Sequence, residues 1–391
     1  HVVMGLIMSA LDRLMSGQLG GSLTMESVHC RQVLISVVVD GADISALVNE
    51  RLVSLEVTDE AGIVSDGFEL VLDDRDFAVA IPLTGATLSI ALGYVGEAMV
   101  PMGVYSVDEI ESGGRANKMT LRGKSADMSA SMKSQRKQSW HKTTLGKVLS
   151  EIAARNKLKE AFADEYKKIA IDHLDQSYES DIALLTRLAE QYGAVGKPSG
   201  GYLVFVKRGA SVNAKGEPLP VVSVDLSADG FSSWSCSEQE RSYYGSVRAY
   251  WNDKRNPKKD NSVTVGKAEP LKLIKTPFKD QASAKAAAQA ELERGALGRY
   301  SLNVSMLGNP LIVAESTINV TGIKPECCGE WVVTSVRHSV PGAYTTSFTA
   351  CRKSDFVREE MERKEQEREE KQKEATKKSG QRTKSATATK K

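Results

Sequence analysis

Five histidines are the side chains best suited to acid–base or metal chemistry in this 391-residue chain, and they are scattered, at positions 1, 29, 141, 173 and 338. No two lie four residues apart, so no helix carries the paired ligands of a zinc enzyme. His173 lies in IDHLDQSYESD, where Asp172 and Asp175 could support it as a general base. We interpret it instead as part of the link into the next helix. His141 follows Trp140, and we interpret this pair as a packing anchor rather than a catalytic group.

His338 closes the segment EWVVTSVRH (330–338), which alternates like a strand. The period of two predicts that His338 points to the side opposite Trp331. It would share its face with Val332, Thr334 and Val336. A metal ligand or general base is one interpretation and a strand-end residue is the other. The lack of a neighbouring carboxylate or cysteine motif favours the second.

Two short motifs resemble parts of catalytic signatures. Gly123-Lys124-Ser125 ends like a phosphate-binding loop, but position 118 is Lys where that motif requires Gly. Ser134 and Lys137 satisfy S-x-x-K without the partner motifs found in β-lactamases. Neither G-x-S-x-G nor H-E-x-x-H occurs in the sequence. We therefore predict no catalytic, cofactor-binding or metal-binding residue, no cofactor, and a protein that is not an enzyme.

The cysteines are Cys30, Cys236, Cys327, Cys328 and Cys351, and none forms a C-x-x-C pair. They are too few for a disulfide framework in a chain of this length. Cys327 and Cys328 could form a strained vicinal disulfide, but we favour a reduced pair in a loop because ordinary disulfide geometry needs well-separated backbones. Synthesis in a reducing cytoplasm is expected.

Charge and composition exclude several classes of protein. The chain has 52 basic and 50 acidic residues, a formal charge of +2, so no global field attracts nucleic acid or anionic lipid. Hydrophobic residues make up 41% and charged residues 26%, which is typical of a globular protein rather than a disordered or integral membrane one. The apolar run from Val2 to Ala10 is far too short to span a bilayer, so no stable membrane insertion is expected.

The two ends of the chain differ from its body. Residues 1–30 carry neither a basic n-region nor a signal cleavage site, which predicts a flexible leader. Residues 353–391 form a charged tail, in which i,i+4 acid–base pairs favour a partly helical first half and the final 13 residues are typical of disorder. Those 13 residues carry four of the positive charges, and without them the body has a formal charge of −2.

Residues 31–130 are expected to form a β domain curled into a barrel. VLISVVVD (33–40) is strongly β-branched, and RLVSLEVTD (51–59) alternates apolar and polar residues. Turn residues such as Asp40-Gly41 separate the segments. One face of each strand is therefore apolar, as in a sheet that surrounds a core.

Residues 137–210 are expected to form a small helical α+β domain. Thr144 is the predicted N-cap of its first helix, and Ser180 is the predicted N-cap of its second. Gly193 should end the second helix in the left-handed region. The segment YLVFV (202–206) then predicts a short strand.

From residue 216 to residue 352 the alternating pattern returns and predicts a second β-barrel domain. Its strand-like segments are VVSVDL (221–226), YYGSVRAYW (243–251), YSLNVSM (300–306), TINVTG (317–322), EWVVTSVRH (330–338) and YTTSFTA (344–350). One alanine-rich helix, 280–294 with Asp280 as its cap, interrupts them. The predicted fold class is mainly β with an α+β insertion.

Three longer segments carry a resemblance: SWHKTTLGKVLSEIAARNKL (139–158), IDHLDQSYESDIALLTRLAEQYGAVGKPSGGYLVFVKRG (171–209) and INVTGIKPECCGEWVVTSVRHSVPGAYTTSFTA (318–350). The Q-S-x-E-S-D and LTRLAE parts of the second are the most specific. The stretches 40–74 and 81–94 look like the opening of the same family. Together, over about 33 to 352, they resemble the phage late control D family, the tail hub proteins of contractile-tailed phages and phage-like particles.

The resemblance implies a structural hub. In such hubs two similar tube-forming β-barrel domains flank a small α+β domain, and a homotrimer presents six barrels to a sixfold tail tube and a threefold spike. The implied partners are further copies of the chain, the tail spike protein, and tail tube and baseplate proteins, with DNA only as passing cargo in the lumen. The implied location is the virion tail baseplate, with assembly in the host cytoplasm.

Three other functions are weighed against the hub. A type VI secretion spike resembles it in the hub part but continues into a glycine-rich β-prism, where this sequence has a charged tail. A tail-associated cell-wall-degrading enzyme needs paired carboxylates or a zinc motif. A transcription regulator needs a helix-turn-helix and a basic face. The sequence favours the hub over all three.

Overall fold

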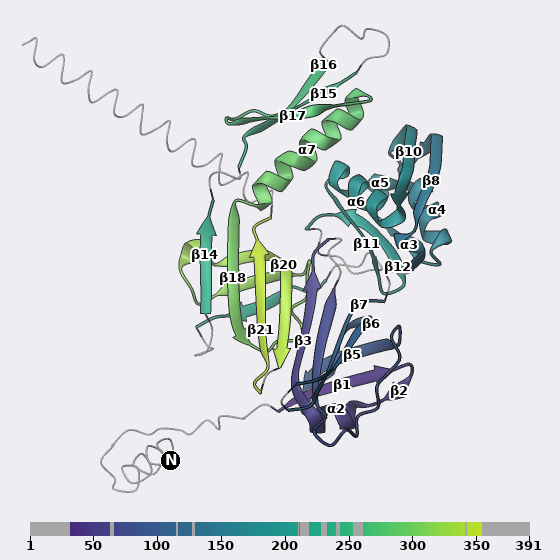
Figure 1. Cartoon of the computed structure of the whole chain (residues 1–391). Helices are drawn as coiled ribbons and strands as arrows, with labels where there is room; N and C mark the ends of the chain where they lie inside the picture. The colour runs from purple at the N-terminus through teal and green to yellow at the C-terminus, as the bar shows by residue number, and fades with distance from the viewer. Residues whose placement is uncertain are drawn as a thin grey trace, which may run out of the picture.

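The computed structural model describes residues 32–353, apart from 63–65, 115, 127–129, 210, 212–218, 228–232, 240–242, 253–260 and 341. The predicted leader and nearly all of the predicted charged tail lie outside the described residues. The described chain is mainly β with an α+β insertion, as predicted, and its buried apolar side chains gather in four cores. In Figure 1 two β-rich units lie side by side in the lower part of the view, and two units that contain helices lie above them.

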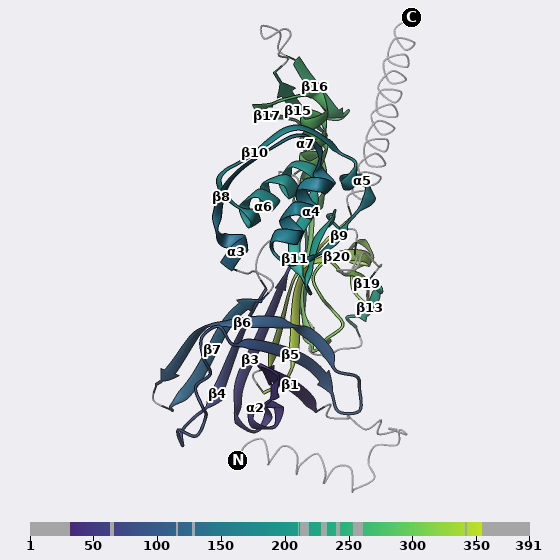
Figure 2. The same cartoon turned by 90° about the vertical axis from the view of Figure 1, so that its right-hand side faces the viewer.

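The first β unit is a curved antiparallel sheet around one core (Figure 2). Its elements are β1 (Val33–Val39), β2 (Ala42–Asp43), α2 (Ser45–Arg51), β3 (Leu52–Glu60), β4 (Gly67–Asp73), β5 (Thr87–Tyr94), β6 (Val100–Gly113) and β7 (Lys118–Ser125). The strand order is β3-β4-β7-β6-β5-β1-β2. Leu55, Leu70 and Leu88 are fully buried because alternate residues of each strand point into the core.

The inserted α+β unit is built around two capped helices. Its elements are α3 (Ala130–Lys133), β8 (Gln135–Thr144), α4 (Leu145–Arg155), β9 (Lys159–Phe162), α5 (Asp164–Lys167), β10 (Ala170–Ser180), α6 (Asp181–Tyr192), β11 (Ala194–Ser199) and β12 (Tyr202–Lys207). The side chains of Thr144 and Ser180 accept hydrogen bonds at the starts of α4 and α6. Gly193 follows α6 with a φ of 63°. These predicted helix boundaries are confirmed.

A two-stranded ribbon of β8 and β10 curves over the helices, where the sequence patterns predict a polar stretch and a link (Figure 2). The prediction for His173 was therefore wrong: it lies in β10, directly opposite His141 of β8. Trp140 and Leu174 are buried on the inner side of the ribbon. The remaining residues are mostly polar, which weakens the apolar alternation by which strands are recognised in a sequence.

The second β unit has the same antiparallel core pattern. Its elements are β13 (Val222–Asp225), β14 (Ser233–Glu238), β18 (Tyr300–Leu307), β19 (Thr317–Thr321), the 3-10 turn η2 (Pro325–Cys327), β20 (Gly329–Val340) and β21 (Thr345–Cys351). The strand order is β14-β18-β21-β20-β19-β13, with only β13 and β19 parallel. Trp331, Val336 and Phe348 belong to its core.

Between β14 and β18 the chain forms a further small unit of one sheet and one helix. Its elements are β15 (Ser246–Trp251), β16 (Asn261–Gly266), β17 (Leu271–Phe278) and α7 (Gln281–Leu297). Asp280 Oδ1 accepts a hydrogen bond from Ser283 N at 2.7 Å, which confirms the predicted cap. Ala284 and Ala288 pack against β15. The strand expected at 243–251 thus joins this separate sheet rather than the main one.

The two β units repeat one pairing scheme. The path β3-β4-β7-β6-β5 of the first corresponds to β14-β18-β21-β20-β19 of the second. A β-bulge interrupts the β6·β7 register between Val107 and Glu109, and another interrupts β20·β21 between Val333 and Ser335. At the first bulge Val107 O accepts a hydrogen bond from Gly85 N, and at the second Val333 O accepts one from Glu315 N. Val107 and Val333 are therefore equivalent positions.

One antiparallel seam joins the two β units into a sheet of 13 described strands. The second half of β20 pairs with β3, from Ser335 opposite Glu60 to Val340 opposite Leu55. Figure 1 shows β3 beside β20 at the centre of the molecule. The first half of the same β20 edge pairs with β19. Two units far apart in the sequence thus share one continuous hydrogen-bonded surface.

The bulge in β20 overturns the predicted face of His338. Thr334 is the extra residue, so the side-chain alternation shifts by one between Val333 and Ser335. His338 is buried on the core face together with Trp331 and Val333, not opposite Trp331 as predicted. An uninterrupted period of two cannot account for a strand that contains an inserted residue.

Candidate assembly surfaces

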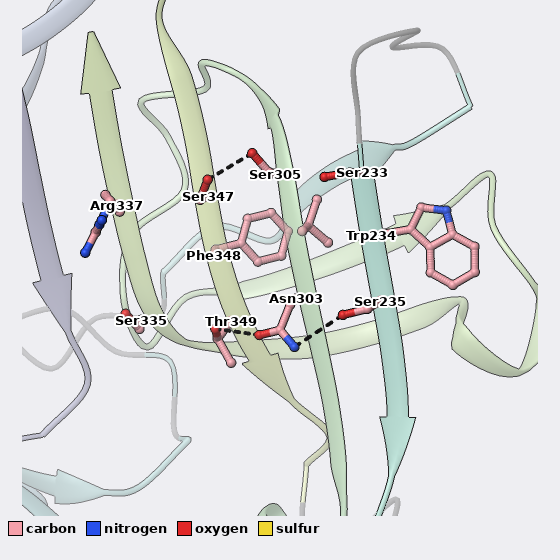
Figure 3. A pocket seen from close by; sticks show the side chains of 11 residues that line it. Ser233, Trp234, Ser235, Asn303, Ser305, Ser335, Arg337, Ser347, Phe348 and Thr349 are labelled. Carbon is pink, nitrogen blue, oxygen red and sulfur yellow. Dashed lines mark hydrogen bonds between the residues drawn. The ribbon is translucent and has the colours of Figure 1, made fainter. Parts of the chain in front are cut away.

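The outward face of the second β unit is a ladder of small polar side chains (Figure 3). Asn303 Nδ2 donates to Ser235 Oγ at 3.5 Å, and Thr349 Oγ1 donates to Asn303 Oδ1 at 2.8 Å. Ser347 Oγ lies 3.0 Å from Ser305 Oγ in the next rung. A shallow hollow of about 520 Å³ runs along this ladder. Arg337 also lines the hollow and lies 3.4 Å from Glu56, so this surface is polar and its charges are paired.

The same face continues onto the first β unit and becomes charged. Arg122 of β7 contacts three carboxylates, those of Glu69, Glu109 and Glu111, at 2.6, 3.4 and 3.1 Å. Hydrogen bonds to Glu69 and Glu111 raise the pKa of Arg122, so the guanidinium stays charged. Three carboxylates thus surround one guanidinium, and two lysines of the same strand face, Lys118 and Lys124, lie on either side of Arg122.

The edges of β14 and of the second half of β6 are among those in the 13-stranded sheet that have no partner among the described strands. β14 pairs on one edge with β18. β6 pairs with β7 along Tyr105–Gly113. The opposite edge of β6 pairs with β5 from Val100 to Ser106, and no described strand pairs with that edge after Ser106. Exposed apolar side chains lie at these edges: Trp234 on β14 is 39% exposed, and Leu83, in the loop before β5, is 82% exposed. Unpaired edges with apolar neighbours are typical of surfaces that pair with another chain.

A buried ionic junction holds three units together. Lys197 of β11 donates from Nζ to Glu60 O at 3.0 Å and lies 4.0 Å from Asp59 Oδ1. Asp59 Oδ2 accepts from Ala314 N of the second β unit at 2.8 Å. The first β unit, the inserted unit and the second β unit therefore meet at one carboxylate.

The electrostatics of this junction are set by burial and by crowded carboxylates. Burial and the nearby Asp66 raise the pKa of Asp59 to about 7. Burial alone would lower the pKa of Lys197, but the surrounding carboxylates, Asp59 first, outweigh it and raise the pKa. Lys197 is therefore charged at neutral pH and balances several acids. This is a structural ion cluster, and its members were not singled out from the sequence because they come from three distant segments.

His338 is a buried structural residue in a hydrogen-bond network. Its Nε2 donates to Ile312 O at 3.0 Å, because a carbonyl oxygen can only accept. Nδ1 then accepts from Tyr344 Oη at 2.8 Å and lies 3.2 Å from Thr346 Oγ1. Burial lowers the pKa of His338 to about 4, so the ring is neutral. Both nitrogens are occupied, which leaves neither for a metal or a substrate.

His173 and His141 are brought together by the ribbon register. Their Nδ1 atoms lie 3.0 Å apart and their rings stack with centroids 4.5 Å apart. His173 Nε2 contacts Asp175 Oδ2 at 2.7 Å, and Ser139 Oγ donates to the other oxygen of Asp175. Asp172, the other carboxylate expected beside His173, is exposed. Within the described ranges, no group of three or more His, Cys, Asp or Glu side chains is arranged to hold a metal ion.

The remaining predicted motifs have structural explanations. Gly123 lies inside strand β7, where a Cβ would collide with Ser106 O, so Gly123-Lys124-Ser125 is not a loop leading into a helix. Lys137 lies in β8. Cys327 and Cys328 are free thiols at η2, and Cys327 O accepts from the Trp331 indole at 2.9 Å. In the part of the chain that is described, no helix is long and apolar enough to cross a bilayer.

A sheet built from two copies of one pairing unit, with a polar face and strand edges that lack a partner among the described strands, is typical of proteins that assemble into larger structures. Residues 63–343 match the phage tail baseplate hub (GPD) family. The chain belongs to that family, as the sequence resemblance implies.

A curated relative agrees with this membership, and solved structures share the fold. The chain is 32% identical over 342 residues to the probable baseplate hub protein of Escherichia phage 186, covering 76% of this chain and 87% of the relative. The 43 kDa tail protein of prophage MuSo2 from Shewanella oneidensis has the same fold, with a TM-score of 0.63, 14% identity, and 83% and 99% of the two chains covered. A chain of the Francisella PdpA–VgrG complex is similar with a TM-score of 0.53 and 10% identity, over 90% of this chain and 62% of the other.

Proposed function

We propose that this chain is the structural hub of a phage tail baseplate, acting as a homotrimer that joins the sixfold tail tube to the threefold spike. The observation that carries the proposal is the repeated β pairing scheme joined by the β20·β3 seam. Three copies of a chain with two such units supply six similar units, which reconciles threefold and sixfold symmetry in one ring.

The polar face of the sheet suits the lining of that ring. Its ladder around Asn303 is neutral, and its Arg122 cluster has more carboxylates than guanidinium groups. Lys118, Lys124 and Arg337 also lie on this face and bring it close to charge balance. A wall without a basic excess holds phosphates weakly, because tight DNA binding requires basic side chains that neutralise them. DNA would therefore pass through the lumen as cargo without being retained.

The proposed partners and location follow from the hub role. Tail tube and baseplate proteins would meet one end of the ring and the tail spike protein the other, in the virion tail, after assembly in the host cytoplasm. The role is structural and not catalytic. His338, the most buried of the candidate histidines, bonds a carbonyl and two hydroxyls of its own unit.

A hub within a type VI secretion-like spike is the second candidate, and the fold similarity to the Francisella chain favours it. The two candidates differ in their neighbours: a phage hub binds a separate spike protein, whereas a type VI spike carries its needle in the same polypeptide. No observation favours a tail-associated cell-wall-degrading enzyme.

Light scattering on the purified chain, with and without a tail spike protein, tests the proposal. We expect a trimer, either alone at high concentration or upon addition of spike. A chain that remains a monomer in both conditions and does not bind tube or spike would contradict the hub role, whatever its sequence resembles.

A further inference from the structure

Resting on the proposed trimer, we infer that β6 of one copy pairs with β14 of the next copy in the register of the internal β20·β3 seam. The occupant of each free edge is thus a second copy of this chain. The inference gives a residue-by-residue contact between copies and not only a number of subunits.

The first support is the correspondence of positions between the two units. Matching the bulges aligns Val107 with Val333 and Glu109 with Ser335. The cross-strand partners then extend this alignment to β3 and β14. Leu55 of β3 lies opposite Leu70 of β4, and Trp234 of β14 lies opposite Val304 of β18. Because β4 and β18 are equivalent strands, Leu55 is the counterpart of Trp234. Each strand at the internal seam therefore has a counterpart in the other unit.

The second support is that the edges without a described partner are the counterparts of the edges that pair in the internal seam. β20 pairs with β19 along its first half and with β3 along the second half of the same edge. β6 pairs with β5 along its first half, and no described strand pairs with the same edge beyond Ser106. The unfilled part of β6 is the counterpart of the part of β20 that binds β3.

The third support is burial at equivalent positions. Leu55, at the internal seam, is fully buried, whereas its counterpart Trp234 is 39% exposed. In the loops that accompany these strands, Val313 is half-buried beside β3, whereas its counterpart Leu83 is 82% exposed beside the vacant edge. Apolar side chains that are covered at the internal seam are thus uncovered where the second copy would dock.

The internal register predicts the contacts between copies. Arg337 pairs with Thr58 in the internal seam, and their counterparts are Glu111 and Ser237. We therefore place Glu111 of one copy directly opposite Ser237 of the next, with both side chains on the polar face.

The seam between copies lacks the ionic junction of the internal seam. Asp59 meets Lys197 and Ala314, whereas its counterpart Glu238 binds Arg299 of its own unit at 2.6 Å. Backbone pairing and the burial of Trp234 and Leu83 must then supply most of the association. The ring should therefore open between copies before the two units of one chain separate.

Disulfide trapping tests the register. Directly opposite residues in antiparallel strands lie about 4.5–5.5 Å apart at Cα, within the roughly 4.4–6.8 Å range of disulfides. We expect the Glu111→Cys/Ser237→Cys double variant, assembled as a trimer and oxidised, to form covalent dimers and trimers on non-reducing gels. The matched control is Glu111→Cys/Ser233→Cys, which places a thiol on the same strand face four residues away. We expect at least fivefold less cross-linking from it.

The outcomes separate this inference from the proposed function. A trimer by light scattering that cross-links through Ser233→Cys, or through neither pair, would overturn the register and leave the hub intact. Failure to exceed a monomer, alone or with spike, would overturn both. Each single-cysteine variant measures the background from the native thiols, and cross-linking equal to that background counts against the register.

Discussion

Asp59 of β3 and Lys197 of β11 face each other at the point where three units meet, with 4.0 Å between Oδ1 and Nζ. The Lys197 cation is surrounded by the carboxylates of Asp59, Asp66, Glu315 and Glu60, in that order of influence on its pKa. Lys197 therefore links the inserted unit to the β sheet through an ion cluster.

Lys197→Met should destabilise the protein by about 3 kcal/mol, because removing one partner leaves largely buried carboxylates without a counter-charge. Lys207→Met is the matched control, since Lys207 meets Glu293 at a half-exposed site where ion pairs contribute under about 1 kcal/mol. Unfolding by denaturant measures both. The Asp59→Asn/Lys197→Met double variant should recover part of the loss, and a double variant as unstable as Lys197→Met alone would contradict this coupling.

The raised pKa of Asp59, about 7 against an ordinary 3.8, predicts a pH-dependent stability. The folded state holds the proton more tightly than the unfolded chain, so this contribution is complete below pH 4 and is lost as pH rises through 7. The difference in melting temperature between the wild type and Asp59→Asn, measured at each pH, isolates the contribution of Asp59 titration to stability. The difference should fall between pH 4 and 7 and then level off, and a constant difference would show that Asp59 titrates normally.

The pKa of His338 predicts a change of stability with pH in the opposite direction. Its pKa is lowered by burial to about 4 from 6.5, so the unfolded chain binds a proton in this range and the folded protein does not. Stability should be lost as pH falls from 6.5 to 4. His338→Gln, which retains hydrogen-bonding capacity without the charge, should be less sensitive to acid. Equal acid sensitivity of the two proteins in thermal unfolding would argue against a neutral buried His338.

Gly123→Ala should be destabilising by about 1–3 kcal/mol, because the new Cβ would meet Ser106 O and the ring of Phe68 inside the sheet. Lys124→Ala, in the same motif, should change stability little. A phosphate-binding loop would make the opposite prediction, with Lys124 essential for nucleotide binding. Thermal unfolding and nucleotide titration of both variants distinguish the two.

Leu55→Ala and Trp234→Ala alter equivalent positions and should have different effects. Leu55→Ala removes fully buried atoms and should cost about 2–5 kcal/mol of stability. Trp234→Ala, at a side chain that is 39% exposed, should cost the isolated chain less than Leu55→Ala does and should weaken trimer formation at least tenfold. Light scattering across a dilution series measures the second effect. Equal loss of stability from both would mean that Trp234 is part of the monomer's own core.

Much of the secondary structure could be predicted because it depends on neighbours in the sequence. The alternation around Leu55 and Leu70 follows from one buried face per strand. Thr144, Ser180 and Asp280 cap helices through hydrogen bonds to N–H groups three residues ahead. The lysine at position 118 was enough to dismiss the phosphate loop, which the strand β7 confirms.

The sequence by itself determined the fold class, the helix ends and the family of this protein. Tertiary structure alone decided the face of His338, through a bulge at Thr334, and the partner of His173, through the register with His141. It alone brought Asp59 to Lys197 across 138 residues. The physical reason is that local patterns specify which side of a strand is apolar, whereas register, bulges and edges depend on which distant strands meet.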